Sequence, residues 1–441
     1  MNCERLRMHH ELESMEEFFL EDNQEFDRKY AFKVLKKLCK IGSRVVASEG
    51  EAKSAALIAR YFEEFGLSEV KISKYPFTFY DGKEGSISQR NIRLLSGVPC
   101  WMSASTSDYG IEKETLYIGT HNNLSKYSKE DIQDKIVFVL LGQQYMSDVL
   151  EAWDKLFDMK PAGVIFLDRE RDEAPRSYNY EKLNDTFSKA PSMTVSAKLA
   201  RPFHDRMFGS TLKLTLRGQA EDGTLHNVLG RIQGHLNKTI IVCAHHDTVP
   251  FTMGATDNAA GVAIMIELAR LLSRMDLNYS YQFIAFGGEE LGMKGSQKLL
   301  ETYDLSDTVL CLNFDSIGAL PGQVLALSAG PDEMIEWITQ LAQTNKYPAR
   351  CRRAATSGGD NIPFAVEGIP TIHLACLGTT SEKVSHTAID DISNLTSWSL
   401  FEVGTLATRI VQSLEASDSL PFAVEVPDDL LEAAEKKLAS D

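Results

Sequence analysis

Three largely apolar runs, at residues 240–244, 281–286 and 309–314, are short and rich in β-branched or aromatic side chains. Such runs are typical of strands that are buried on both faces, as in a parallel sheet covered by helices. The first run stops at His245 and the third stops at Asp315. The sequence therefore predicts an α/β fold with histidine and carboxylate side chains at strand ends, where open α/β sheets bind ligands.

Two further segments add carboxylates beside these strand ends. Asp257 precedes a helical pattern that includes Val262 and Ile266, so it suits a helix N-cap or a ligand that bridges two metal ions, and the two roles do not exclude each other. Glu289 and Glu290 follow the second run and two glycines. Because neighbouring side chains diverge, one carboxylate of this pair can bind a metal ion while the other holds the attacking water.

The fifth segment carries His386, a loop histidine that gains weight only from the other four. Side chains two apart on a strand point the same way, so Asp247 can orient His245 by accepting its second ring N–H. The set then has three carboxylates, two imidazoles and no thiolate, which suits two zinc ions per chain. Two ions about 3.5–4 Å apart need a bridging carboxylate, and Asp257 is the best candidate.

The ordered motifs H-x-D, D-N-A-x-G, E-E-x-G-x-x-G-S, N-x-D and H-T-x-x-D resemble those of the co-catalytic dizinc exopeptidases. This family includes bacterial secreted leucine aminopeptidases, yeast vacuolar aminopeptidase Y and glutamate carboxypeptidases, and the resemblance covers nearly all of residues 25–418. It implies a zinc aminopeptidase that hydrolyses the N-terminal peptide bond. It assigns His245 and Asp315 to one zinc ion, Glu290 and His386 to the other, Asp257 as the bridge, Glu289 as the general base, and Asp247 and Asp390 as supports of the ligands.

One element departs from the family pattern. Residues 357–374 resemble the family's S-D-H-x-x-F…G-I-P element, with Asp360 at its acid, but Asn361 stands where histidine is usual. Several relatives place a tyrosine just upstream to stabilise the oxyanion, and residues 353–357 contain none. Zinc itself polarises the carbonyl, so catalysis need not fail, but the sequence does not identify the additional oxyanion donor.

The resemblance implies a three-layer α/β/α domain with a mixed central sheet, interrupted by an insertion. Residues 92–219 carry strand and helix patterns of their own, which resemble a protease-associated domain; the alternative is an α/β domain of unrelated origin. Either insert is expected to overhang the site and to limit substrate size. The predicted division is an acidic extension at 1–24, a peptidase domain at 25–91 and 220–418, the inserted smaller α/β domain at 92–219, and an amphipathic tail at 419–441.

Composition limits the partners and the compartment. The chain has 441 residues, enough for two domains, and its net charge of −16 argues against nucleic acid and anionic membrane as partners. Seven scattered cysteines without a C-x-x-C pair fit free thiols, and the N-terminus lacks the apolar region of a signal peptide. No segment approaches the roughly 20 apolar residues of a membrane span. We therefore expect a cytoplasmic enzyme that acts on peptides, with its oligomeric state open and a homo-oligomer compatible.

Several functions compete with the aminopeptidase, which is favoured because a free α-amine can sit beside the second zinc ion. A dizinc carboxypeptidase or dipeptidase would need cationic groups such as Arg350, Arg352 and Arg353, although a solvated loop is the simpler interpretation. A glutaminyl cyclase would hold one zinc ion, but the intact D-N-A-A-G-V and E-E-L-G motifs look more like the peptidases. A metal-free receptor-like domain is disfavoured because all five ligands are present, and a serine hydrolase because G-x-S-x-G is missing.

Overall fold

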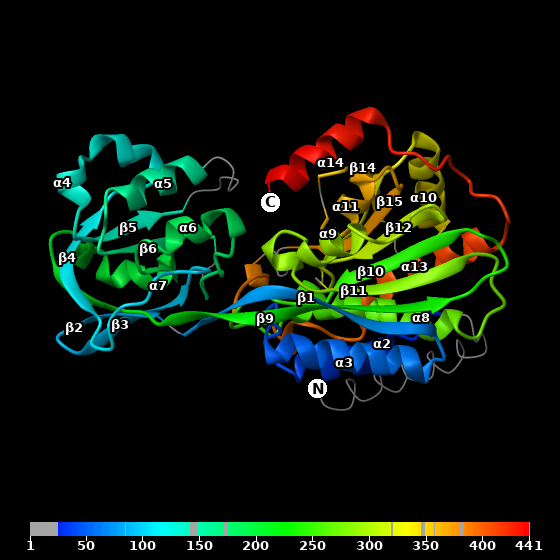
Figure 1. Cartoon of the computed structure of the whole chain (residues 1–441), viewed down its shortest axis with the longest axis horizontal. Coiled ribbons are helices and arrows are strands. Elements are labelled where there is room, and N and C mark those ends of the chain that lie inside the picture. Colours follow the sequence, from blue (N-terminus) through cyan, green and yellow to red (C-terminus); the bar gives the residue numbers. More distant parts are fainter. Residues whose placement is uncertain are drawn as a thin grey trace, which may run out of the picture.

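The computed structural model describes residues 25–440 apart from 84, 142–148, 171–173, 319–320, 345–348, 357 and 379–382. The predicted acidic extension at 1–24 lies outside the described residues. The described chain forms a larger lobe around an open sheet and a smaller lobe around a barrel, and two long strands run between them (Figure 1). None of the described helices combines the length and the apolar character that crossing a bilayer needs.

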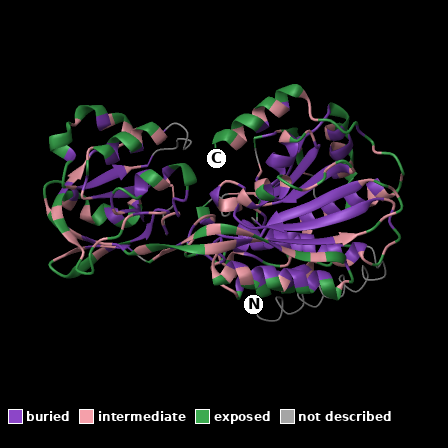
Figure 2. Ribbon diagram, in the orientation of Figure 1, coloured by how far each residue is buried: buried purple, intermediate pink, exposed green. Residues whose placement is uncertain are grey.

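The larger lobe is built on an eight-stranded sheet with the order β1-β9-β11-β10-β12-β15-β13-β14. Its central strands β11, β10, β12 and β15 are parallel neighbours, whereas β9 and β13 pair with them in the antiparallel sense, so the sheet is mixed as predicted. These central strands are buried along almost their whole length (Figure 2). The strands are β1 (Ser68–Gly82), β9 (Gly218–Ile232), β10 (Thr239–His245), β11 (Ser280–Phe286), β12 (Thr308–Phe314), β13 (Gln323–Ala329), β14 (Arg350–Arg353) and β15 (Thr371–Leu377).

Five long helices cover one face of this sheet. Alternate residues of β10, Ile240, Val242 and Ala244, point into the hydrophobic core beneath these helices. The apolar residues that α8 presents to the same core recur at helical spacing, as the sequence predicts. The helices are α2 (Arg28–Cys39), α3 (Glu49–Glu64), α8 (Ala260–Leu272), α10 (Asp332–Thr344) and α13 (Trp398–Glu415).

Shorter helices cover the other face, which completes the three layers. The intervening residues of β10, Ile241 and Cys243, pack there against residues of α9 (Lys294–Leu300) and α11 (Asn361–Val366). The C-terminal helix α14 (Asp428–Ser440) packs on α11 through Leu430 and Ala434. The predicted amphipathic tail therefore packs on the larger lobe of its own chain.

The smaller lobe is a closed barrel with the strand order β2-β3-β7-β6-β5-β4-β8. One side of each strand fills the barrel, and the other side of β5 and β6 packs against helix α5. The barrel begins at Gly85, before the predicted boundary at 92, and its last strand ends at Thr215, before 219. Its elements are β2 (Gly85–Gln89), β3 (Ile92–Pro99), β4 (Ile111–Tyr117), η1 (His121–Lys126), α4 (Lys129–Ile132), β5 (Ile136–Leu140), α5 (Leu150–Asp158), β6 (Gly163–Asp168), η3 (Glu181–Leu183), α6 (Asn184–Phe187), β7 (Ser192–Ser196), α7 (Ala197–Ala200), η4 (Arg201–Met207) and β8 (Thr211–Thr215).

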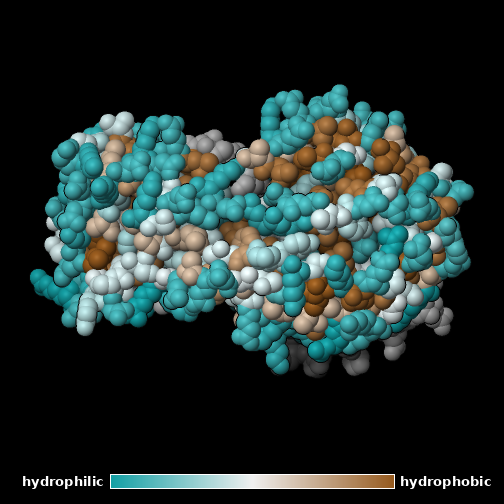
Figure 3. Space-filling view, viewed as in Figure 1, coloured by the Kyte–Doolittle hydropathy of each residue, from teal (hydrophilic) through white to brown (hydrophobic). Residues whose placement is uncertain are grey.

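The antiparallel pair β1 and β9 connects the two lobes. Its register runs from Ser68 opposite Arg231 in the larger lobe to Gly82 opposite Gly218 beside the barrel. Hydrophilic side chains cover most of the smaller lobe on the face drawn in Figure 3, while hydrophobic ones are visible in several places on the larger lobe. The cysteines within the described ranges are all free thiols, as the sequence predicts.

Candidate metal centre

The first two predicted ligands lie at the ends of neighbouring strands. β10 ends at His245, and β12 ends one residue before Asp315. Side chains alternate along a strand, so both residues continue the rows of Cys243 and Cys311, on the face that α9 and α11 cover. Because β10 and β12 are parallel neighbours, Nε2 of His245 comes to 3.3 Å from Oδ1 of Asp315.

Asp257 lies in the turn η5 (Ala255–Ala259), directly before α8. The N-cap of α8 is Ala259, so the interpretation of Asp257 as the helix cap does not hold. Asp390 fixes the backbone of this turn: its carboxylate accepts the N–H of Asp257 at 3.0 Å and that of the preceding residue at 2.8 Å. The Asp257 side chain is therefore available to the site.

Glu289 and Glu290 lie in the turn η6 (Glu289–Leu291), between Gly288 and Gly292 in the left-handed region. The two carboxylate oxygens of Asp247 accept the backbone N–H groups of Glu289 at 3.2 Å and of Glu290 at 3.3 Å. Oδ1 of Asp247 also lies 3.4 Å from Nδ1 of His245, which is longer than a good hydrogen bond. Asp247 thus anchors the turn that carries both glutamates, in addition to facing His245.

His386 lies beside Asp257 and Glu290, in a loop of the larger lobe. Its φ of 61° lies in the left-handed region, which is uncommon for a residue other than glycine. Its Nε2 lies 3.0 Å from Oε2 of Glu290 and 3.1 Å from Oδ2 of Asp257. Ser385 donates its hydroxyl to the same oxygen of Asp257 at 2.6 Å.

The five predicted ligands form two donor groups that share Asp257. The first group is His245, Asp257 and Asp315, the second is Asp257, Glu290 and His386, and within each group the donor atoms all lie within 4.8 Å of one another. Oδ1 of Asp257 lies 3.2 Å from Nε2 of His245, while its Oδ2 faces His386. One carboxylate thus offers an oxygen to each group, and carboxylates with imidazoles are a donor set that fits zinc.

The charges inside the two groups balance poorly without a cation. Burial lowers the pKa of His245, but the negative charges of Asp315 and Glu289 outweigh burial and raise that pKa well above its usual range. Glu290 has the same effect on the pKa of His386. Burial raises the pKa of Glu290 to about 7. Clustered, buried acids and imidazoles of this kind favour a functional site over a structural one.

Glu289 belongs to neither donor group. Its Oε2 lies 3.9 Å from Nε2 of His245, and burial raises the pKa of its carboxyl group well above the usual range. Gly359 leaves the space for this side chain, because a Cβ at position 359 would lie 2.5 Å from Oε1 of Glu289. A half-buried carboxylate that lies beside His245 but belongs to neither donor group is placed to transfer a proton.

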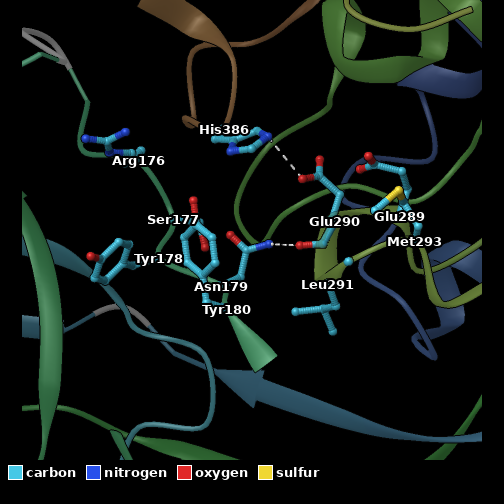
Figure 4. A pocket seen from close by; sticks show the side chains of 11 residues that line it. Arg176, Ser177, Tyr178, Asn179, Tyr180, Glu289, Glu290, Leu291, Met293 and His386 are labelled. Carbon is cyan, nitrogen blue, oxygen red and sulfur yellow. Dashed lines mark hydrogen bonds and ion pairs between the residues drawn. The ribbon is translucent and has the colours of Figure 1, made fainter. Parts of the chain in front are cut away.

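A pocket of about 160 Å³ lies beside the second group, between the lobes (Figure 4). Residues 176–180 of the smaller lobe form one wall, residues 289–293 of the larger lobe form another, and His386 lies between them. The insert predicted to overhang the site therefore lines this pocket, and it contributes both tyrosines of the lining, Tyr178 and Tyr180.

The arginines considered for a carboxypeptidase lie elsewhere. Arg350, Arg352 and Arg353 form the exposed edge strand β14, and none of them lines the described pocket. Arg353 instead pairs with Asp429 of α14 at 3.0 Å. Position 357, at the end of the segment that lacks the family's tyrosine, lies outside the described residues.

Sequence reasoning missed Arg44, whose guanidinium group is fully buried. It donates to the backbone carbonyl oxygens of His246 at 2.8 Å, Met253 at 2.5 Å and Gly254 at 3.1 Å. It thereby fixes the connection from His245 to Asp257. No local motif marks such a residue, because its partners are backbone atoms about two hundred positions away.

This chain is similar to several known peptidases. The model of peptidase family M28 matches residues 227–411. Aminopeptidase YwaD of Bacillus subtilis is 26% identical over 420 residues, which cover 91% of this chain and 88% of the relative. The solved zinc aminopeptidase BSAP of B. subtilis matches 92% of this chain and 99% of its own, with a TM-score of 0.73 and 21% identity. The aminopeptidase of Aneurinibacillus sp. strain AM-1 matches 92% and 98%, with a TM-score of 0.68 and 19% identity, so both structures share the fold.

Proposed function

We propose that the chain belongs to peptidase family M28 and is an aminopeptidase that uses two zinc ions to hydrolyse the N-terminal peptide bond. The observation that carries the proposal is the position of Asp257. Its two carboxylate oxygens face two different histidines, at 3.2 Å from Nε2 of His245 and 3.1 Å from Nε2 of His386. A carboxylate that divides its oxygens in this way suits a bridge between two cations.

Five residues would hold the ions. His245 and Asp315 would bind the first, Glu290 and His386 the second, and Asp257 both. Bound in these groups, the ions would supply Lewis acidity to the peptide carbonyl and lower the pKa of a water molecule. Asp247 and Asp390 would keep the ligand backbones in place through the hydrogen bonds described above.

Glu289 would perform the proton transfers. It lies within the cluster but outside both donor groups, so it can accept a proton from the attacking water and return it to the leaving amine.

The pocket supports action at a chain end. A cavity of about 160 Å³ is close in size to one that admits a benzene ring, so it has room for the side chain of one substrate residue. The relatives that match nearly the whole chain are named aminopeptidases, which supports an N-terminal substrate. The similarity of the barrel to a protease-associated domain and the cytoplasmic location stay predictions.

A panel of fluorogenic aminoacyl substrates tests the proposed function. The assay is run with and without chelator, on protein whose metal content has been counted, and N-acetylated versions of the same substrates serve as controls. We expect hydrolysis of the free-amine substrates only, its loss with chelator and its return with Zn²⁺. Cleavage of N-blocked peptides that carry a free carboxyl terminus would instead identify a carboxypeptidase.

A further inference from the structure

The smaller lobe hydrogen-bonds to the backbone of Glu290 and His386, the two ligands that belong only to the second donor group. The backbone N–H of Ser177 donates to the carbonyl oxygen of His386 at 2.9 Å, within an antiparallel bridge between Arg176 and Thr387. The carboxamide Nδ2 of Asn179 donates to the carbonyl oxygen of Glu290 at 2.5 Å (Figure 4). One short segment of the barrel domain thus contacts two ligand-bearing loops of the other lobe.

This segment is itself fixed to the barrel. Asp168, at the end of β6, accepts the backbone N–H of Arg176 at 3.2 Å. Thr194 of β7 donates its hydroxyl to the Arg176 carbonyl oxygen at 2.5 Å. Tyr178, between Ser177 and Asn179, is buried, and its hydroxyl accepts a hydrogen bond from the indole N–H of Trp153 at 3.1 Å. The contacts with Glu290 and His386 are therefore made from a well-anchored part of the insert.

The second group needs this support more than the first. His245 and Asp315 are placed by the pairing of two buried parallel strands. Glu290 and His386 lie in turns, His386 has the φ of 61°, and its side chain is 40% exposed whereas that of His245 is 1% exposed. A residue in a strained and half-exposed turn, as His386 is, keeps its position only when neighbouring contacts fix it, whereas the side chain of Glu290 is 4% exposed.

We propose that Asn179 is a positioning residue for the second metal ion, and that docking of the insert completes this half of the centre. The inference rests on the proposed pair of metal ions. Asn179 is 7% exposed, and only its N–H₂ group can donate to the Glu290 carbonyl oxygen. Asp247 of the larger lobe accepts the backbone N–H of Glu290. Glu290 is thus held between the two lobes.

Asn179→Ala and Asn179→Asp test the proposal. Alanine removes the donor, and aspartate keeps the shape but presents an acceptor to the carbonyl oxygen. Metal-free protein is titrated with Zn²⁺ against a chromophoric chelator, so that binding is measured apart from activity. We expect the first ion to bind as in the wild type and the second to bind roughly 10-fold more weakly, the lower end of the effect of removing an outer hydrogen-bond partner.

The matched control is Asn123→Ala, the same change within the insert. Asn123 lies in η1 and accepts an exposed hydrogen bond from Lys126, so this variant should bind both ions like the wild type. Thermal melting of the metal-free variants checks folding, and excess Zn²⁺ should restore the turnover of the Asn179 variants. Restoration would place the defect in metal occupancy rather than in the fold.

Three different results would overturn the proposal. If the wild type binds two ions and both Asn179 variants bind the second one equally well, the positioning role is wrong while the proposed function stands. If the wild type binds fewer than two ions, the two-metal function fails together with it. A variant that weakens both ions equally would also contradict the role, because it would show general destabilisation.

Discussion

The two halves of the candidate metal centre are built in different ways. His245 and Asp315 extend two parallel strands of the central sheet, so the buried sheet itself sets the distance between them. Glu290 and His386 lie in turns that touch the inserted barrel. The two halves share Asp257, whose backbone N–H donates to Asp390 of the larger lobe. One half of the centre is therefore preformed by the fold of one lobe, whereas the other half depends on how the two lobes dock.

This difference implies unequal metal affinities. A donor group on rigid strands loses little conformational freedom when an ion binds, whereas turns must be ordered at a cost in free energy. We therefore expect the first group to bind Zn²⁺ more tightly than the second. The predictions below either break this asymmetry or sharpen it.

The largest effect is expected for Asp257→Ala, which removes the residue that the two halves have in common. Both groups lose a ligand, so metal counting should show fewer than one ion per chain and turnover should fall to that of chelator-treated enzyme. His386→Ala is the matched comparison and should cost only the second ion. Two ions retained in Asp257→Ala would show that this residue is not the bridge.

Glu289→Gln should separate proton transfer from metal binding. Because Glu289 lies outside both donor groups, the variant should keep both ions and lose at least about a hundredfold in kcat, the usual size of a general-base effect. Counting the bound ions checks the metal content, and steady-state kinetics on the same protein checks the loss in kcat. Turnover near that of the wild type would remove Glu289 from the mechanism.

Zinc affinity should fall as pH falls. In the metal-free chain the pKa values of His245 and His386 are raised by nearby carboxylates, so both imidazoles hold protons to a higher pH than usual. A ligand must release its proton to bind metal, so affinity rises with pH until these raised values are passed, by about tenfold per pH unit for each proton released. Competition with a chelator at several pH values measures the affinity for Zn²⁺, and an affinity that does not change with pH would contradict the prediction.

Gly359→Ala is expected to have the smallest effect. A Cβ at this position would lie 2.5 Å from Oε1 of Glu289, so the carboxylate must move by up to about 1 Å to reach ordinary contact, and the nearest atoms that the Cβ meets all belong to Glu289. Since a displacement of about 1 Å can cost a hundredfold in rate, a loss of less than about a hundredfold in kcat is expected. Metal content should stay at the wild-type value, and loss of an ion would show that Glu289 also binds metal.

The same contrast explains what the sequence could predict. Strand periodicity identified His245 and Asp315, because apolar runs that end in such residues leave a local pattern. His386 has no such pattern and was assigned only through family resemblance. Asn179 was missed, since a single amide lies 111 positions from its partner Glu290 and no local spacing connects them. The alternative role of Asp257 as a helix cap is not seen, because the N-cap of α8 is Ala259.

The central claim is that one bridging carboxylate serves two metal sites of unequal strength. Stepwise addition of Zn²⁺ to metal-free protein, with bound ions and hydrolysis of an aminoacyl substrate followed together, tests it most directly. The account predicts two ions per chain, a tighter first one, and turnover that rises as the second binds. Saturation with a single ion, or two ions of equal affinity, would contradict it.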